Sequence, residues 1–88
     1  MDRGFLERQI LYRSSHRGTK EADALLGGFF RSVSSSFTVE QLVSFGKLVE
    51  ESDADIMDWL KGEKRVPEGQ LSEIIRPLKL YYKNLLNN

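Results

Sequence analysis

Cysteine is absent from this chain of 88 residues, and histidine occurs once, at position 16. Without cysteine the chain forms no disulfide and carries no thiolate nucleophile, and one imidazole cannot build a zinc site from His and Cys ligands. A reducing compartment is compatible with that composition. The length allows one domain with a modest core, and leaves no room for a cofactor domain beside a substrate domain.

Long hydrophobic runs are also missing. No apolar stretch approaches the ~20 residues that span a bilayer, and the N-terminus has no continuous apolar signal segment. Four arginines in the first 17 residues suggest a mitochondrial presequence, but Asp2 and Glu7 interrupt them and the stretch has helical apolar spacing. We therefore expect a soluble, mature, unprocessed protein without membrane insertion.

The formal charge sums to zero but is unevenly distributed. Residues 1–20 hold five cations and two acids, whereas residues 40–63 hold seven acids and two cations. The sequence therefore predicts a dipolar molecule. Nucleic-acid binding normally requires a basic excess, and residues 64–88 provide only a mild one, so no nucleic-acid partner is expected.

Apolar residues recur at helical spacing, and no stretch alternates long enough to require a strand. The sequence predicts an all-α, compact five-helix bundle that forms a single domain over residues 1–88. The expected helices cover approximately residues 3–14, 19–33, 39–49, 53–61 and 68–86. The last one presents Leu71, Ile74, Ile75, Leu78, Tyr82 and Leu85 on one face.

Several residues mark the helix boundaries. Thr38 with Gln41 forms a capping box, and Ser52 with Asp55 repeats that spacing. Gly62 is placed to end the fourth helix. We further expect Pro67 to open the last helix.

Three other positions are expected to shape the bundle from within. Pro77 falls inside the last helix and predicts a kink between residues 73 and 77. Gly27-Gly28 interrupts an apolar stripe, which favours close packing against a neighbouring helix over a ligand role. Trp59 lies between Ile56 and Leu60, which favours a place in the core over an anchor for a partner.

Residues 17–21, Arg-Gly-Thr-Lys-Glu, combine a cation, a glycine and a carboxylate where one helix gives way to the next. The simpler interpretation is a helix boundary with Glu21 in a first turn, where the helix dipole favours a negative charge. The alternative places Arg17 and Glu21 on one helix face, with Gly18 leaving room for another backbone. Such a flat, charged surface suits docking onto a protein.

No set of residues supports catalysis. His16 follows Ser14 and Ser15, but neither an orienting group nor an oxyanion hole accompanies them, which disfavours a small hydrolase. The acids of residues 50–58 lack the spacing of an EF-hand loop, and no glycine-rich phosphate loop follows a strand. We expect no enzyme activity, no bound metal and no stably bound cofactor.

Three landmarks in order carry a resemblance: residues 17–23, then Phe29-Phe30, then residues 48–60, Leu-Val-Glu-Glu-Ser-Asp-Ala-Asp-Ile-Met-Asp-Trp-Leu. Together they resemble the FAD assembly factor family of succinate dehydrogenase, the small helical flavinylation factors of bacteria and mitochondria. The resemblance covers nearly the whole chain. It implies a dedicated chaperone that binds the flavoprotein subunit of succinate dehydrogenase, and often of fumarate reductase, and promotes covalent attachment of FAD.

The resemblance also implies where the docking surface lies. Arg17, Gly18 and Glu21 match the family's R-G-x-x-E motif, and His16 and Asp23 flank it. His16 stands where a second basic residue is common, and Thr19 stands where a larger apolar residue is usual. A generic helical adaptor without a flavoprotein client is the alternative.

In this family the covalent bond is generally regarded as formed within the flavoprotein, so FAD would belong to the partner. The factor itself would act as a monomer. It would work in the bacterial cytoplasm, or in the mitochondrial matrix of a eukaryote.

Overall fold

The computed structural model describes residues 2–87 and contains five α-helices with one 3-10 turn over that range. The elements are α1 (Arg3–Ser15), α2 (Lys20–Val33), η1 (Ser34–Ser36), α3 (Val39–Leu48), α4 (Asp53–Lys61) and α5 (Gln70–Leu86). The prediction of an all-α, five-helix, single-domain fold is confirmed.

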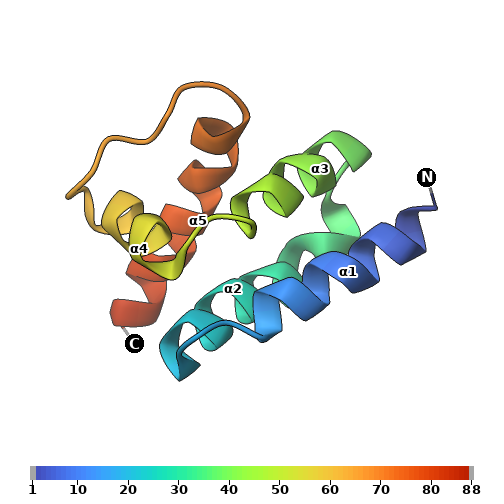
Figure 1. Cartoon of the computed structure of the whole chain (residues 1–88), viewed down its shortest axis with the longest axis horizontal. Helices are drawn as coiled ribbons and strands as arrows, with labels where there is room; N and C mark the ends of the chain where they lie inside the picture. The colour runs from blue at the N-terminus through green and yellow to red at the C-terminus, as the bar shows by residue number, and fades with distance from the viewer. Residues whose placement is uncertain (1, 88) are drawn as a thin grey trace.

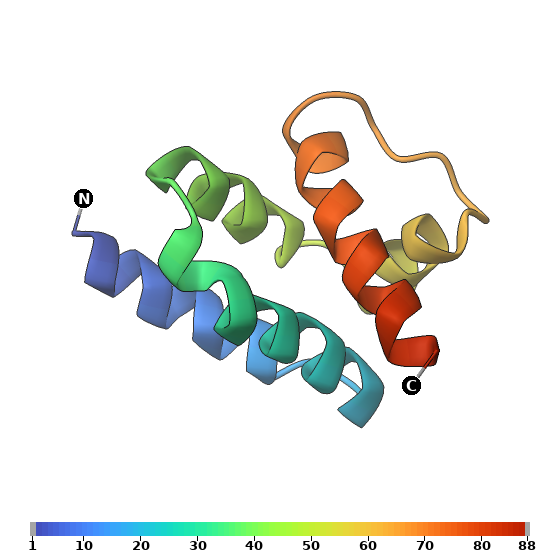
Figure 2. The ribbon, with the colours of Figure 1, turned by 180° about the vertical axis from the view of Figure 1, so that it is seen from behind.

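The helices form two groups that share one core. Helices α1 and α2 form an antiparallel hairpin, and α3 returns over it after the turn at η1 (Figure 1). Helices α4 and α5 lie at the other end, where α5 packs against α3, α4 and α2 (Figure 2). The loop from α1 to α2 thereby comes close to the turn between α3 and α4.

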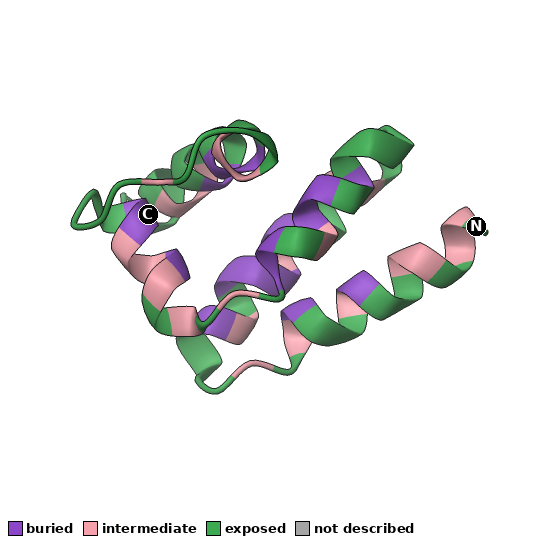
Figure 3. Ribbon diagram, turned by 45° about the horizontal axis from the view of Figure 1, so that its top comes forward, coloured by how far each residue is buried: buried purple, intermediate pink, exposed green. Residues whose placement is uncertain are grey.

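Aromatic side chains form the centre of the core. The Phe45 ring on α3 lies 5.4 Å from Phe30 and 5.6 Å from Phe29, measured between ring centroids. Every helix contributes to the buried set, which also contains Ile10, Leu25, Leu26, Leu42, Leu48, Ile56, Trp59, Ile74, Ile75 and Leu78. The buried positions follow the inner side of each helix (Figure 3). Trp59 is 2% exposed, so its expected place in the core is confirmed.

The two adjacent glycines of α2 allow two close helix contacts. A Cβ at Gly27 would lie 2.9 Å from Ser15 Oγ of α1, and one at Gly28 would lie 2.7 Å from the Tyr81 hydroxyl of α5. Both distances are too short for a real methyl group. The predicted close packing at Gly27-Gly28 is confirmed, with a different partner helix on each side.

The predicted start of α3 and the predicted bounds of α4 are also confirmed. Thr38 and Gln41 form a reciprocal capping box at the start of α3. The Ser52 side chain accepts a hydrogen bond from the Asp55 N–H, and Gly62 ends α4 in the left-handed conformation at φ 75°. These local signals lie within a few residues of one another, so the sequence could reveal them.

The start of the last helix was predicted wrongly. Pro67 does not open α5, because the chain remains irregular to Gly69, whose φ of 113° breaks the helical path before Gln70. Leu85 was expected in the core but is 43% exposed, since it lies on the last turn of α5 beyond the packed helices. Helix α5 continues through Pro77 without interruption.

Candidate functional site

The candidate site is the segment His16–Asp23, which joins α1 to α2. Thr19 is the N-cap of α2, and its hydroxyl accepts a hydrogen bond from the Ala22 N–H. Glu21 and Asp23 occupy the first turn, as the helix dipole favours. Because α2 begins at Lys20, Arg17 and Glu21 do not share a helix face; that expectation was wrong.

The Arg17 side chain is directed into the fold. Its Nε donates a 2.8 Å hydrogen bond to Asp53 Oδ1, and its Nη2 donates a 2.7 Å bond to the Glu51 carbonyl. Nη1 donates to the Val49 carbonyl. The side chain is only 10% exposed. A planar guanidinium suits this task, since it can bridge several acceptors at once, and here it ties the α1–α2 loop to the α3–α4 turn.

The Gly18 backbone completes this connection. Its N–H donates a 3.1 Å hydrogen bond to Asp53 Oδ2, so one carboxylate binds both Arg17 and Gly18. A Cβ at Gly18 would lie 3.3 Å from the same oxygen. The Arg17 backbone N–H donates to Asp23 Oδ1, which fixes the loop to α2 as well. We call Arg17, Gly18, Asp23 and Asp53 the loop clamp.

The five residues that the sequence proposed for docking therefore divide into two sets. The side chains of Arg17 and Asp23 make contacts within the fold, whereas His16, Gly18 and Glu21 are exposed even though the Gly18 N–H donates to Asp53. The His16 ring stacks on Tyr12 at 3.9 Å between centroids, and Nδ1 lies 2.7 Å from the Tyr12 carbonyl oxygen. Over residues 2–87, Glu21 takes part in no ion pair. The exposed set can meet a partner directly.

Sequence reasoning missed the outer face of α1, which adjoins this loop. Phe5 is 47% and Tyr12 63% exposed, and together with Arg8, Gln9 and Arg13 they line a shallow hollow. Phe5 and Tyr12 had been read simply as apolar positions of the first helix. Their spacing from His16 and Arg8, in steps of three or four, places these side chains on one outward stripe. The stripe is aromatic and basic.

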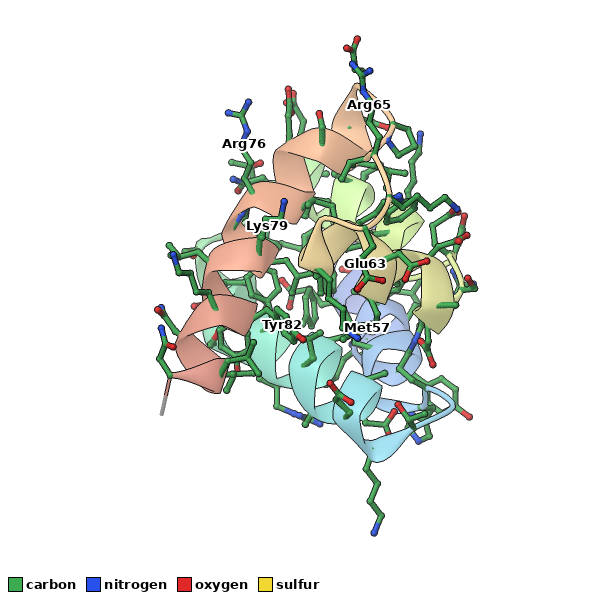
Figure 4. All side chains as sticks on the ribbon, turned by 90° about the vertical axis from the view of Figure 1, so that its left-hand side faces the viewer. Met57, Glu63, Arg65, Arg76, Lys79 and Tyr82 are labelled. Carbon is green, nitrogen blue, oxygen red and sulfur yellow. The ribbon has the colours of Figure 1, made fainter. Side chains whose placement is uncertain are left out.

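The face made by α4, α5 and their connecting loop is different in character. Glu63, Arg65, Arg76 and Lys79 extend from it, while Met57 and Tyr82 lie half-buried between the two helices (Figure 4). Charges of both signs are mixed here, so this face lacks the single-sign character of the α1 stripe.

A groove between α3 and α5 is the site whose lining bears on FAD binding. It encloses about 600 Å³ and is lined by Glu40, Glu73, Gln41, Gln70, Val39, Val43 and neighbouring residues, with no cation. A pyrophosphate favours cations or helix N–H groups, and two carboxylates repel it. The carboxylates of Glu40 and Glu73 disfavour a pyrophosphate in this groove, although residues of the first turns of α3 and α5 also line it.

Metal and membrane sites can be addressed for the same part of the chain. Between residues 2 and 87, no group of three or more His, Cys, Asp or Glu side chains is arranged to hold a metal ion. None of the helices described over that stretch has the length and hydropathy to cross a bilayer.

Comparison with known proteins gives consistent matches. The family described as flavinator of succinate dehydrogenase matches residues 8–81. "Succinate dehydrogenase assembly factor 2, mitochondrial" of Schizosaccharomyces japonicus is 39% identical over 77 residues, which cover 86% of this chain and 54% of that protein. "FAD assembly factor SdhE" of Acetobacter pasteurianus is 35% identical over 69 residues, covering 78% and 63%.

A shorter bacterial relative aligns along most of both chains. "FAD assembly factor SdhE" of Acinetobacter baylyi is 29% identical over 75 residues, covering 85% of this chain and 87% of that protein. The chain spans only 54% and 63% of the S. japonicus and A. pasteurianus proteins. No solved structure gives a significant match.

Proposed function

Because this chain belongs to the family of flavinators of succinate dehydrogenase, we propose that it binds the flavoprotein subunit of that enzyme and promotes its covalent flavinylation. The observation that carries the proposal is the family match over residues 8–81, which includes the whole candidate site. FAD belongs to the partner in this proposal, which is supported by the Glu40 and Glu73 carboxylates of the α3–α5 groove, since they disfavour a pyrophosphate.

The exposed set of the candidate site supports direct docking. Gly18 presents backbone without a side chain, and Glu21 extends from the first turn of α2 with its carboxylate exposed. The aromatic and basic stripe of α1 continues this surface through His16. Aromatic and arginine side chains are enriched at the centres of protein interfaces. We therefore assign the α1 stripe and residues 18–21 to one docking surface.

The proposed role is that of a chaperone and not of a catalyst. His16 is the single imidazole of the chain, and its ring stacks on Tyr12 with Nδ1 against a carbonyl oxygen. Among residues 2–87, its hydrogen-bond partner is that carbonyl oxygen and not a nucleophile. The flavoprotein would itself form the bond to FAD, while this chain holds it in a competent arrangement.

The family relationship also bears on further client proteins and on the compartment in which the chain works. The flavoprotein subunit of fumarate reductase is a further client in this proposal, and one copy of the chain acts on each client. Relatives whose names place them in mitochondria and relatives from bacteria both match. The working compartment would be the matrix or the bacterial cytoplasm accordingly.

The test is covalent flavin fluorescence of the succinate dehydrogenase flavoprotein on a denaturing gel. Apo-flavoprotein, FAD and the chain are combined, and the signal is compared with and without the chain. Glu21→Ala removes the proposed docking carboxylate, and Glu40→Ala is the matched control. Each glutamate is the second residue of a helix that follows a threonine N-cap, so both substitutions change the helix dipole interaction equally.

We expect fluorescence that depends on the chain, falls with Glu21→Ala and persists with Glu40→Ala. Gly18→Asp is a poorer probe, because a carboxylate there would lie beside Asp53 and disturb the loop clamp as well as docking. Fluorescence that is indifferent to the chain would overturn the proposal and leave a helical adaptor with another partner.

A further inference from the structure

The Arg17 guanidinium is largely buried at the candidate site, and its polar atoms already have partners. Nε donates to Asp53 at the start of α4, and Nη1 and Nη2 donate to the Val49 and Glu51 carbonyls of the α3–α4 turn. With 10% of the side chain exposed, little of it remains for a partner protein. Any contribution of Arg17 to docking must therefore be indirect, because it acts by holding the α1–α2 loop in position.

Asp53 is the acceptor that links this guanidinium to the loop backbone. Oδ1 accepts from Arg17 Nε at 2.8 Å, and Oδ2 accepts from the Gly18 N–H at 3.1 Å. The two oxygens of a single carboxylate thus fix the side chain of one residue and the backbone of the next. Gly18 cannot move outward without breaking a charge-assisted hydrogen bond.

Asp53 is itself held rigidly. It is the first residue of α4, directly after the N-cap Ser52, whose side chain accepts from the Asp55 N–H. A helix N-terminus is a favourable place for a carboxylate, and here the Asp53 carboxylate accepts both hydrogen bonds. The carboxylate is therefore placed by α4 and not by the loop that it holds.

We propose that Asp53 is a positioning residue for client docking: with Arg17 it holds Gly18 and Glu21 at the angle at which the flavoprotein meets them. This inference rests on the proposed function. It assigns the first residue of α4, 36 residues from Arg17 along the chain, to the recognition of the client. In it, Arg17 acts through the loop and makes no essential contact with the client.

The test compares Asp53→Asn with Asp55→Asn. Both substitutions remove a first-turn carboxylate of α4, and both remove an ion pair, with Arg17 and with Lys64 respectively. Only Asp53 touches the loop. The chain is titrated against a fixed amount of apo-flavoprotein with FAD, and the half-maximal concentration and the plateau of covalent flavin fluorescence are measured separately.

We expect Asp53→Asn to raise the half-maximal concentration by about tenfold, the change that corresponds to one ordinary hydrogen bond to a charged group. The plateau should stay near that of the unsubstituted chain, because a saturating concentration restores docking. Asp55→Asn should leave both quantities unchanged. Circular dichroism shows whether each variant is folded at the assay temperature.

A second measurement does not depend on the client. In the free chain, amide hydrogen exchange at Gly18 should accelerate in Asp53→Asn and remain as in the unsubstituted chain in Asp55→Asn. Arg17→Lys gives a further route if Asp53→Asn folds poorly, since lysine keeps the charge but cannot bridge three acceptors. Its effect on the half-maximal concentration should not add to that of Asp53→Asn, because the two residues form one unit.

The outcomes separate this inference from the proposed function. If the unsubstituted chain fails to promote flavinylation, the proposed function is wrong, and this inference is wrong with it. If the unsubstituted chain works and Asp53→Asn, though folded, has the same half-maximal concentration, the positioning role alone is wrong. Equal losses in Asp53→Asn and Asp55→Asn would also overturn it, because they would indicate a general effect on α4.

Discussion

The aromatic core and the loop clamp hold different parts of this small protein by different means. In the core, Phe45 packs against the rings of Phe29, Phe30 and Phe37, and the burial of apolar area dominates these contacts. In the clamp, the atoms of Arg17 and Asp53 meet acceptors and donors at hydrogen-bond distances. Burial of apolar area stabilises the core, whereas hydrogen bonds of defined geometry stabilise the loop clamp.

The core therefore accounts for the stability of the protein, and the loop clamp accounts for the conformation of the α1–α2 loop. Dispersion and the hydrophobic effect tolerate small shifts, because many weak contacts are shared among neighbours. A bridging guanidinium tolerates little, since each of its bonds weakens steeply with misalignment. A docking loop of a few residues has no core of its own, so directional bonds to a helix N-terminus are an effective way to fix it.

The largest expected effect lies in the core. Phe45→Ala removes a ring that is 0% exposed and that contacts three other aromatic rings. Truncation of a buried phenylalanine costs about 3–5 kcal/mol, a large part of the stability of a domain of this size. Chemical denaturation monitored by circular dichroism measures the loss. A change below about 1 kcal/mol would mean that the core does not depend on this ring.

A smaller loss of stability is expected from the clamp. Arg17→Lys keeps the positive charge but loses the fork that reaches the Glu51 and Val49 carbonyls. Hydrogen bonds to charged groups contribute about 1.5–3 kcal/mol, so we expect a loss toward the lower end of that range. The same denaturation experiment applies, with Arg13→Lys as control, because the Arg13 pair with Glu50 is half-exposed. Equal losses in the two variants would contradict a special role for the clamp.

The parts of this molecule that the sequence could reveal are those whose causes are local. The Thr38–Gln41 capping box and the left-handed Gly62 depend on neighbours within a few positions, and both were predicted. The misplaced start of α5 shows the limit of the same approach. Proline is tolerated at a helix start but does not impose one. Helix α5 instead begins directly after Gly69.

The clamp depends on contacts that no local pattern contains. Asp53 is a first-turn carboxylate of α4, but its bonds to Arg17 and Gly18 join positions 36 and 35 residues apart. The uneven charge along the chain was a partial signal, since the basic N-terminal stretch and the acidic stretch after residue 40 meet here. The family motif located the loop, whereas the direction of each side chain required the fold.

Glu21 differs from the clamp residues, because its loss should affect docking and not folding. Its carboxylate is exposed, and its contribution to stability is limited to the interaction with the α2 dipole. Glu21→Ala should therefore lower the stability by less than about 1 kcal/mol. Thermal unfolding beside the flavinylation assay measures both quantities. A stability loss as large as that of Arg17→Lys would place Glu21 among the structural residues.

The smallest effect is expected at Asp55, the exposed counterpart of Asp53 on the same helix turn. The hydrogen bond from Lys64, with Nζ 2.7 Å from Oδ1, lowers the pKa of Asp55 below its ordinary value of 3.8. Because the folded pKa is the lower one, the stabilisation exists above the unfolded pKa and disappears as the pH falls through the folded pKa. Screening by solvent keeps it small, since both side chains are more than a third exposed.

An NMR titration of the Asp55 carboxyl carbon measures this directly. The midpoint should lie below 3.8 in the unsubstituted chain and rise toward that value in Lys64→Met. The unfolding free energy of Lys64→Met at pH 7 should scarcely change, in contrast to Arg17→Lys. An unmoved midpoint would mean that the Lys64 bond does not persist in solution. A large stability loss would remove the distinction between the two carboxylates, on which the assignment of Asp53 as the residue that fixes the loop depends.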